Sequence, residues 1–197
     1  MRSDTGIASD CRRHTAARLC ILRITLRLLA VVVVTLLAVQ VRAQNSLAPG
    51  CGPQDGQFSV KTNKNYHPEA TIDEGKAALY FIQDDREFAS IPKPTVRIGV
   101  DGKWIGATRG TSYLFAVVDP GEHHLCAIWQ GAPGVGFGKQ FGALHFTAKP
   151  GKAYFFQVRN RWYRDTGSVP MQFEPVDSDQ GKLLIAQFAH SVSQPKK

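Results

Sequence analysis

The chain has 197 residues and a formal net charge of +8, with 24 Lys and Arg residues against 16 Asp and Glu residues. Seven arginines and two aspartates lie within residues 1–43, so this stretch accounts for five of the eight positive charges. The other 154 residues carry only +3, which argues against nucleic-acid binding and suits one domain with its own hydrophobic core.

The N-terminal stretch has the order of an export signal. Several arginines are followed by an apolar run from Leu28 to Val39 and then by Val41-Arg42-Ala43 before Gln44. A membrane-spanning helix needs about 20 apolar residues, and extending this run backwards would include Arg23 and Arg27. We therefore predict a signal helix over 1–43 that is removed, and an extracytoplasmic protein. The alternative is a retained anchor, which would make the protein a membrane-tethered accessory subunit facing outward.

Two cysteines, Cys51 and Cys126, remain after the predicted cleavage. In an oxidising compartment an even pair is most simply a disulfide, which here would close a loop of 75 residues. Two other interpretations stay open, namely a lipid anchor on Cys51 and two free structural thiols.

After the leader, the pattern indicates seven to nine short strands separated by turns. The segments are 57–62, 77–83, 95–100, 103–108, 113–118, 122–129, 143–147, 153–160 and 171–176. Residues 77–83 are apolar at nearly every position, as in a central strand covered on both faces. Asp101-Gly102 predicts a tight hairpin, and Pro-Gly pairs predict type II turns at 119–122 and 149–152.

The one helix that the sequence suggests is short and C-terminal, over 178–189. Ser178 is its candidate cap and Gly181 weakens the prediction, so a last edge strand is the alternative. We expect an all-β fold, an antiparallel β-sandwich. Its parts would be an extension with the first strand at 44–75, the sandwich at 76–190 and a disordered tail at 191–197.

Four motifs resemble a known family. They are Gly75-Lys-Ala-Ala-Leu-Tyr-Phe-Ile82, Val100-Asp-Gly-Lys103 with Ile105-Gly106, Asp119-Pro-Gly-Glu-His-His-Leu125, and Pro150-Gly-Lys-Ala-Tyr-Phe155. Over roughly residues 72–185 the chain is similar to family 2846 of the domains of unknown function. The resemblance implies an exported all-β domain of the cell envelope, and it implies no reaction and no catalytic residues.

The segment 159–164 is the candidate ligand surface, because three arginines are interleaved with an adjacent pair of aromatic residues. Such side chains can stack on sugars and pair with phosphate or carboxylate groups. The residues are Arg159, Arg161, Trp162, Tyr163 and Arg164. Partners of this chemistry outside the cytoplasm are an envelope protein, a glycan or an anionic lipid surface. The structural alternative is a strand end where arginine packs on tryptophan. The acidic run at 84–87 is either a solvated turn or a complement to the basic segment on a neighbouring copy.

The other polar residues give no pattern for metal binding or catalysis. His123 and His124 must point to opposite faces of a strand, so only one of them could join His145. No metal-binding spacing and no catalytic serine motif is present. We therefore expect no cofactor, no metal and no enzyme, but a binding or interaction module. A small hydrolase or metal-binding protein is the distant alternative.

Overall fold

The computed structural model describes residues 48–73, 75–89, 91–131, 140–163, 167–168 and 171–196, with the backbone alone at 162–163 and 167–168. The predicted signal helix at 1–43 and Arg164 lie outside these residues.

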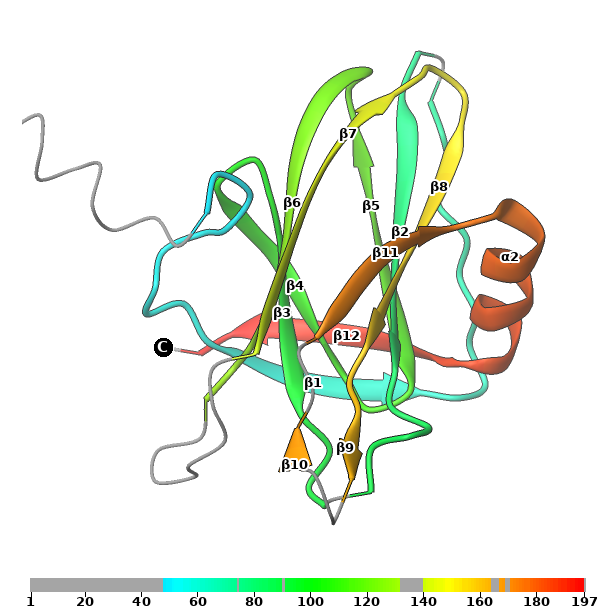
Figure 1. Cartoon of the computed structure of the whole chain (residues 1–197). Coiled ribbons are helices and arrows are strands. Elements are labelled where there is room, and N and C mark those ends of the chain that lie inside the picture. The colour runs from blue at the N-terminus through cyan, green and yellow to red at the C-terminus, as the bar shows by residue number, and fades with distance from the viewer. Residues whose placement is uncertain are drawn as a thin grey trace, which may run out of the picture. The chain divides into compact units, whose positions relative to one another are not determined.

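The described residues form two β-sheets that pack face to face (Figure 1), so the predicted all-β sandwich is confirmed. The six-stranded sheet has the order β1 (Phe58–Asn63), β12 (Ala189–Pro195), β5 (Ser112–Val118), β2 (Ala77–Asp84), β8 (Ala153–Arg159) and β11 (Gln172–Val176). The four-stranded sheet has the order β4 (Lys103–Arg109), β3 (Thr95–Val100), β6 (Gly121–Trp129) and β7 (Phe141–Ala148). A small ribbon pairs β9 (Trp162–Tyr163) with β10 (Gly167–Ser168), and helix α2 covers Ser178–Gln187.

Most strand pairs of the sandwich are antiparallel, as predicted, but the six-stranded sheet is mixed because two of its strand pairs are parallel. Strand β2 runs parallel to β8, and β5 runs parallel to β12. The reason lies in the two Pro-Gly turns, which connect strands of different sheets, β5 to β6 and β7 to β8. Gly121 and Gly151 in these turns have φ values of 135° and 69°, which glycine adopts without strain. Neighbouring strands in a sheet are therefore often distant in sequence.

The Asp101-Gly102 hairpin is confirmed between β3 and β4. Both turn residues have positive φ, 49° and 80°, as a two-residue type I′ turn requires. Val100 and Lys103 are the last pair of the ladder before the turn.

Strand β2 is the centre of the fold, because it lies between β5 and β8 and all its residues are buried. Leu79 and Phe81 point into the core between the sheets. Tyr80 and Ile82 point the other way, into a second apolar cluster that includes residues of α2. The helix therefore covers the outer face of the six-stranded sheet, and β2 is covered on both faces as the apolar pattern of 77–83 predicted.

Helix α2 begins at residue 178 as predicted, but its capping residue is Asp177 and not Ser178. The Asp177 carboxylate accepts hydrogen bonds of 3.0 Å from the backbone N–H groups of Asp179 and Gln180. Among the described residues no helix is long and apolar enough to cross a membrane.

The last strand, β12, replaces the tail that we expected at 191–197. It pairs with β1 on one side and with β5 on the other. Its backbone groups therefore have partners that only the folded sheet provides, and local sequence could not predict them.

The Cys51–Cys126 disulfide is confirmed, with the two Cα atoms 5.1 Å apart. It fastens the segment before β1 onto the outer face of the four-stranded sheet.

Arg97 on β3 holds the same segment. It donates to the carbonyl groups of Gln54, at 3.0 Å, and Gly56, and its guanidinium lies over the Trp104 ring. Arg97 is therefore buried under this segment.

Replacing Gly181 with alanine is expected to destabilise the protein, although alanine favours helix. A Cβ atom at this position would lie 2.2 Å from Cγ of the buried Phe155 ring. Overpacking of this kind costs about 1–3 kcal/mol, against a gain of about 1 kcal/mol in helix propensity. Urea denaturation of Gly181→Ala should show a lower free energy of unfolding, whereas the exposed neighbour change Gln180→Ala should not. A Gly181→Ala protein more stable than wild type would contradict this packing.

Candidate functional site

A charged cleft of about 240 Å³ lies where strands β2 and β8 end. Because these strands are parallel, their carboxyl ends lie side by side at the same end of the sheet, with Asp84 opposite Arg159. The lining residues are Asp84, Arg86, Glu87, Arg159, Asn160 and Arg161. The structure thus brings the acidic run at 84–87 and the basic segment at 159–161 together within one chain.

Asp84 is the most buried of the paired carboxylates in the cleft. It accepts hydrogen bonds from Nε and Nη2 of Arg86, at 2.9 and 2.7 Å, and from Nε2 of Gln157 at 2.8 Å. Burial raises the pKa of Asp84, but the hydrogen bonds and charge of Arg86 outweigh it and hold this pKa below its usual value. Asp84 is therefore a fixed negative charge at neutral pH.

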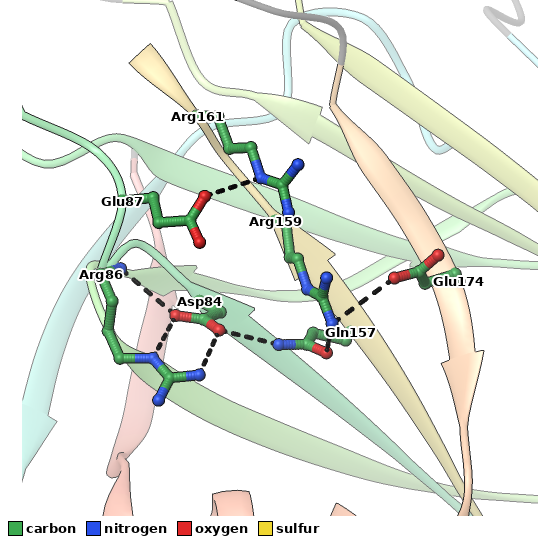
Figure 2. Close-up of polar contacts among 7 residues, drawn as sticks. All are labelled: Asp84, Arg86, Glu87, Gln157, Arg159, Arg161 and Glu174. Atoms are coloured by element: carbon green, nitrogen blue, oxygen red, sulfur yellow. Dashed lines mark hydrogen bonds and ion pairs between the residues drawn. The ribbon is translucent and has the colours of Figure 1, made fainter. Parts of the chain in front are cut away.

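The other two arginines of the cleft also face carboxylates. Nη2 of Arg159 donates to Oε1 of Gln157 at 2.9 Å and lies 3.7 Å from Oε1 of Glu174. Nε of Arg161 lies 2.9 Å from Oε2 of Glu87. Figure 2 shows these contacts, with Asp84 and Gln157 linking Arg86 to Arg159. Three guanidinium groups and three carboxylates therefore neutralise each other around the cleft.

A buried polar network lies beneath the cleft, centred on Asp85, which is completely buried. Nε2 of Gln83 donates to one oxygen of the carboxylate at 2.6 Å, and Nδ2 of Asn160 donates to the other at 2.7 Å. Gln83 accepts from Thr108 on β4, and Asn160 accepts from the indole N–H of Trp129 on β6, both at 2.6 Å. The network joins the two sheets.

Fixed donors and acceptors set the orientation of both amides in this network. The indole nitrogen of Trp129 can only donate, so Asn160 must turn its oxygen to Trp129 and its NH₂ group to Asp85. The carbonyl of Pro94 can only accept a hydrogen bond, and it lies 3.0 Å from Nε2 of Gln83. Gln83 must therefore turn its NH₂ group toward Pro94 and Asp85. Both oxygens of Asp85 are therefore acceptors, as in the ionised form.

The environment of Asp85 opposes this ionisation. Burial raises its pKa to about 6, and the hydrogen bonds from Asn160 and Gln83 and the charge of Lys93 limit the rise. Lys93 Nζ also donates to the backbone carbonyl of Asp85 at 3.2 Å. Asp85 is thus a buried charge stabilised by a complete set of partners, a feature that no local pattern in the sequence signalled.

The predicted ligand surface is placed only in part. Arg159 and Arg161 line the cleft, and Trp162 and Tyr163 form β9. The side chains of these two aromatic residues, like Arg164, lie outside the described residues.

The histidines of β6 separate as expected. His124 faces His145 across the ladder, with ring centroids 4.9 Å apart, and His123 points to the opposite face. Nδ1 of His123 lies 2.7 Å from the Asp101 carboxylate and Nε2 lies 2.7 Å from the Asp119 carbonyl. Burial lowers the pKa of His123, but these two contacts outweigh it and raise this pKa above its usual value. Since both nitrogens face acceptors, His123 holds two turns together and is poorly suited to act as a base.

The described part of the chain contains no group of three or more His, Cys, Asp or Glu side chains that could hold a metal ion. Its two cysteines are joined in the disulfide, so neither offers a free thiol. The cleft instead offers charged donors and acceptors at fixed positions. Such an arrangement is suited to binding by hydrogen bonds.

Replacing Asp85 with asparagine is expected to lower the free energy of unfolding by roughly 1–3 kcal/mol at neutral pH, because the new NH₂ group faces another amide donor. The loss should grow as the pH falls. Folded wild type takes up a proton at Asp85 near pH 6, and the unfolded chain does so only near 3.8, so wild type gains stability between these values. The free energy of unfolding of wild type should rise by on the order of 3 kcal/mol as the pH falls through this range, and the variant lacks this rise.

Urea denaturation from pH 7 to pH 4 measures this difference, in which groups common to both proteins cancel. The exposed change Asp73→Asn is the control and should stay close to wild type. An Asp85→Asn protein as stable as wild type at every pH would contradict the network.

No protein-family model, curated protein or solved structure matches this chain.

Proposed function

We propose that the protein is an exported, non-catalytic binding module of the cell envelope, and that the charged cleft binds a glycan. The observation that carries this proposal is the mutual pairing of the cleft's arginines and carboxylates. The partners that the basic segment suggested were an envelope protein, a glycan and an anionic lipid surface. The pairing favours the glycan.

An anionic surface is attracted by unpaired positive charge. Arg86, Arg159 and Arg161 each face a carboxylate of the same chain, so an incoming anion would have to compete with it. Sugar hydroxyl groups both donate and accept, and they can therefore bind guanidinium and carboxylate groups without separating them. Hydrogen bonds to charged groups are also stronger than neutral ones.

The cleft is accessible and held in place. The side chains of Arg86 and Glu87 are 58% and 59% exposed, whereas Asp84 and Asp85 beneath them are buried. A rigid support of this kind lowers the entropy lost when a ligand binds. Trp162 follows Arg161 in sequence, and tryptophan is a residue type that is suited to stacking on a sugar.

Export is supported by the leader pattern at 1–43 and by the disulfide, which is compatible with an oxidising compartment. The resemblance to family 2846 of the domains of unknown function also favours an envelope domain. A retained anchor is the alternative, and it would leave the same domain tethered to the membrane.

Glycan binding predicts specific losses in two variants. Arg161→Ala and Arg159→Ala should each weaken binding of neutral envelope oligosaccharides by about tenfold or more, since one lost charged hydrogen bond costs roughly 1.5–3 kcal/mol. Calorimetry with the exported protein measures this. Arg109→Ala, an exposed arginine on β4 outside the cleft, is the matched control.

The same protein should be tested on anionic lipid vesicles over a range of salt concentrations. We expect the vesicles to retain the protein only weakly. Strong retention that falls steeply with salt and is equal in Arg161→Ala and wild type would reject the glycan cleft in favour of a general electrostatic surface.

If the leader is removed, the intact mass of the protein should be that of a chain that begins at Gln44. Mass spectrometry of the protein from envelope fractions measures this. A chain that still contains residues 28–39 would instead support the tethered alternative.

A further inference from the structure

Strand β7 forms one edge of the four-stranded sheet and pairs only with β6 among the described residues. The N–H of Trp129 donates to the carbonyl of Gln140 at 2.9 Å, so these two residues form a hydrogen-bonded pair of the ladder. Such pairs alternate along antiparallel strands. The even-numbered residues of β7 therefore bond to β6, and the odd-numbered residues turn their N–H and C=O groups to the free edge.

The groups at this free edge belong to Phe141, Ala143, His145 and Thr147, and all four residues are exposed. They are spaced symmetrically about Leu144. An edge with this symmetry can pair with a copy of itself, because a two-fold axis at Leu144 brings every free donor opposite a free acceptor.

The other edges of the two sheets carry features that hinder strand pairing. Strand β1 has Lys61 and β11 has Pro175. On β4 the backbone N–H of Ala107 is already bonded to Oγ of Ser193 at 3.1 Å. Strand β7 has neither a charged residue of the Asp, Glu, Lys or Arg type nor a proline. Natural sheets protect edges that must not pair, often with charged residues or proline, and the sequence of β7 contains neither device.

The inner side of the β7 edge is also incompletely covered. Leu144 and Phe146 are half-buried, and they line an apolar cleft of about 310 Å³ together with Tyr154 and Phe156 of β8. On the outer side Phe141 is 68% exposed. A second strand beside β7 would cover apolar surface on both sides.

We infer that β7 pairs antiparallel with β7 of a second copy of this chain, so that two four-stranded sheets become one continuous sheet. The two-fold axis passes at Leu144, which faces Leu144 of the other copy in a non-hydrogen-bonded pair. Ala143 of one copy pairs with His145 of the other, and Phe141 pairs with Thr147. Since β7 has no Asp, Glu, Lys or Arg, no like charges of these residue types oppose the contact. The inference does not depend on the proposed function, since no residue of β7 lines the charged cleft.

Analytical ultracentrifugation of the exported protein, expressed from the full chain, tests the inference. A monomer–dimer equilibrium is expected. Ala143→Pro removes an edge donor without affecting the ladder to β6, and it should weaken the dimer about tenfold or more, because two intermolecular hydrogen bonds are lost. Thr62→Pro makes the same change at an exposed, edge-facing position of β1 and should leave the dimer intact. A monomer at all concentrations, or a dimer that Ala143→Pro does not weaken, would overturn the inference.

A crosslink tests the position of the axis independently of proline effects. Non-hydrogen-bonded partners have Cα atoms roughly 4.5 Å apart, within the range of a disulfide. Leu144→Cys should therefore form a covalent dimer on oxidation, with the linked peptides identified by mass spectrometry. Leu183→Cys on the exposed side of α2 should not. Failure of Leu144→Cys to crosslink while wild type dimerises would reject this register.

Discussion

The charged cleft depends on the hydrogen bonds that the buried carboxylate of Asp85 accepts from Gln83 and Asn160. Gln83 and Asn160 each donate to one of its oxygens, and their own oxygens accept from Thr108 and Trp129 of the facing sheet. The sheets are thus joined by hydrogen bonds as well as by apolar packing. The residues next to Asp85 and Asn160 in the chain line the cleft, so the network also sets the position of the cleft side chains.

A network of this kind contributes more to geometry than to stability. A buried charge costs desolvation energy, and apolar side chains of the same volume often stabilise a core as well or better. Apolar packing would not orient Asp84 and Arg161 relative to each other. The raised pKa of Asp85 reflects this compromise, since its partners favour the charge that burial disfavours.

Local patterns predicted the strands well, because alternation and turn chemistry act over a few residues. The Asp101-Gly102 hairpin and the covered strand β2 follow from such patterns, whereas the Cys51–Cys126 pair followed from an even number of cysteines after the predicted cleavage. The parallel pairing of β2 with β8 did not, because Pro-Gly turns look alike whether they join strands of one sheet or of two. Strand β12 was missed because its partners, β1 and β5, are distant in sequence.

The candidate site was predicted only by half. Three arginines near two aromatic residues marked 159–164, but the carboxylate partners of Arg159 and Arg161 are Glu174 on β11 and Glu87 in the turn after β2, which the pairing of β8 with its neighbours brings close. Titration of the Asp85 carboxyl carbon by NMR tests this account most directly. We expect a midpoint near pH 6, accompanied by a shift of the Trp129 indole N–H signal. A midpoint near the ordinary value of 3.8, with no response from Trp129, would contradict it.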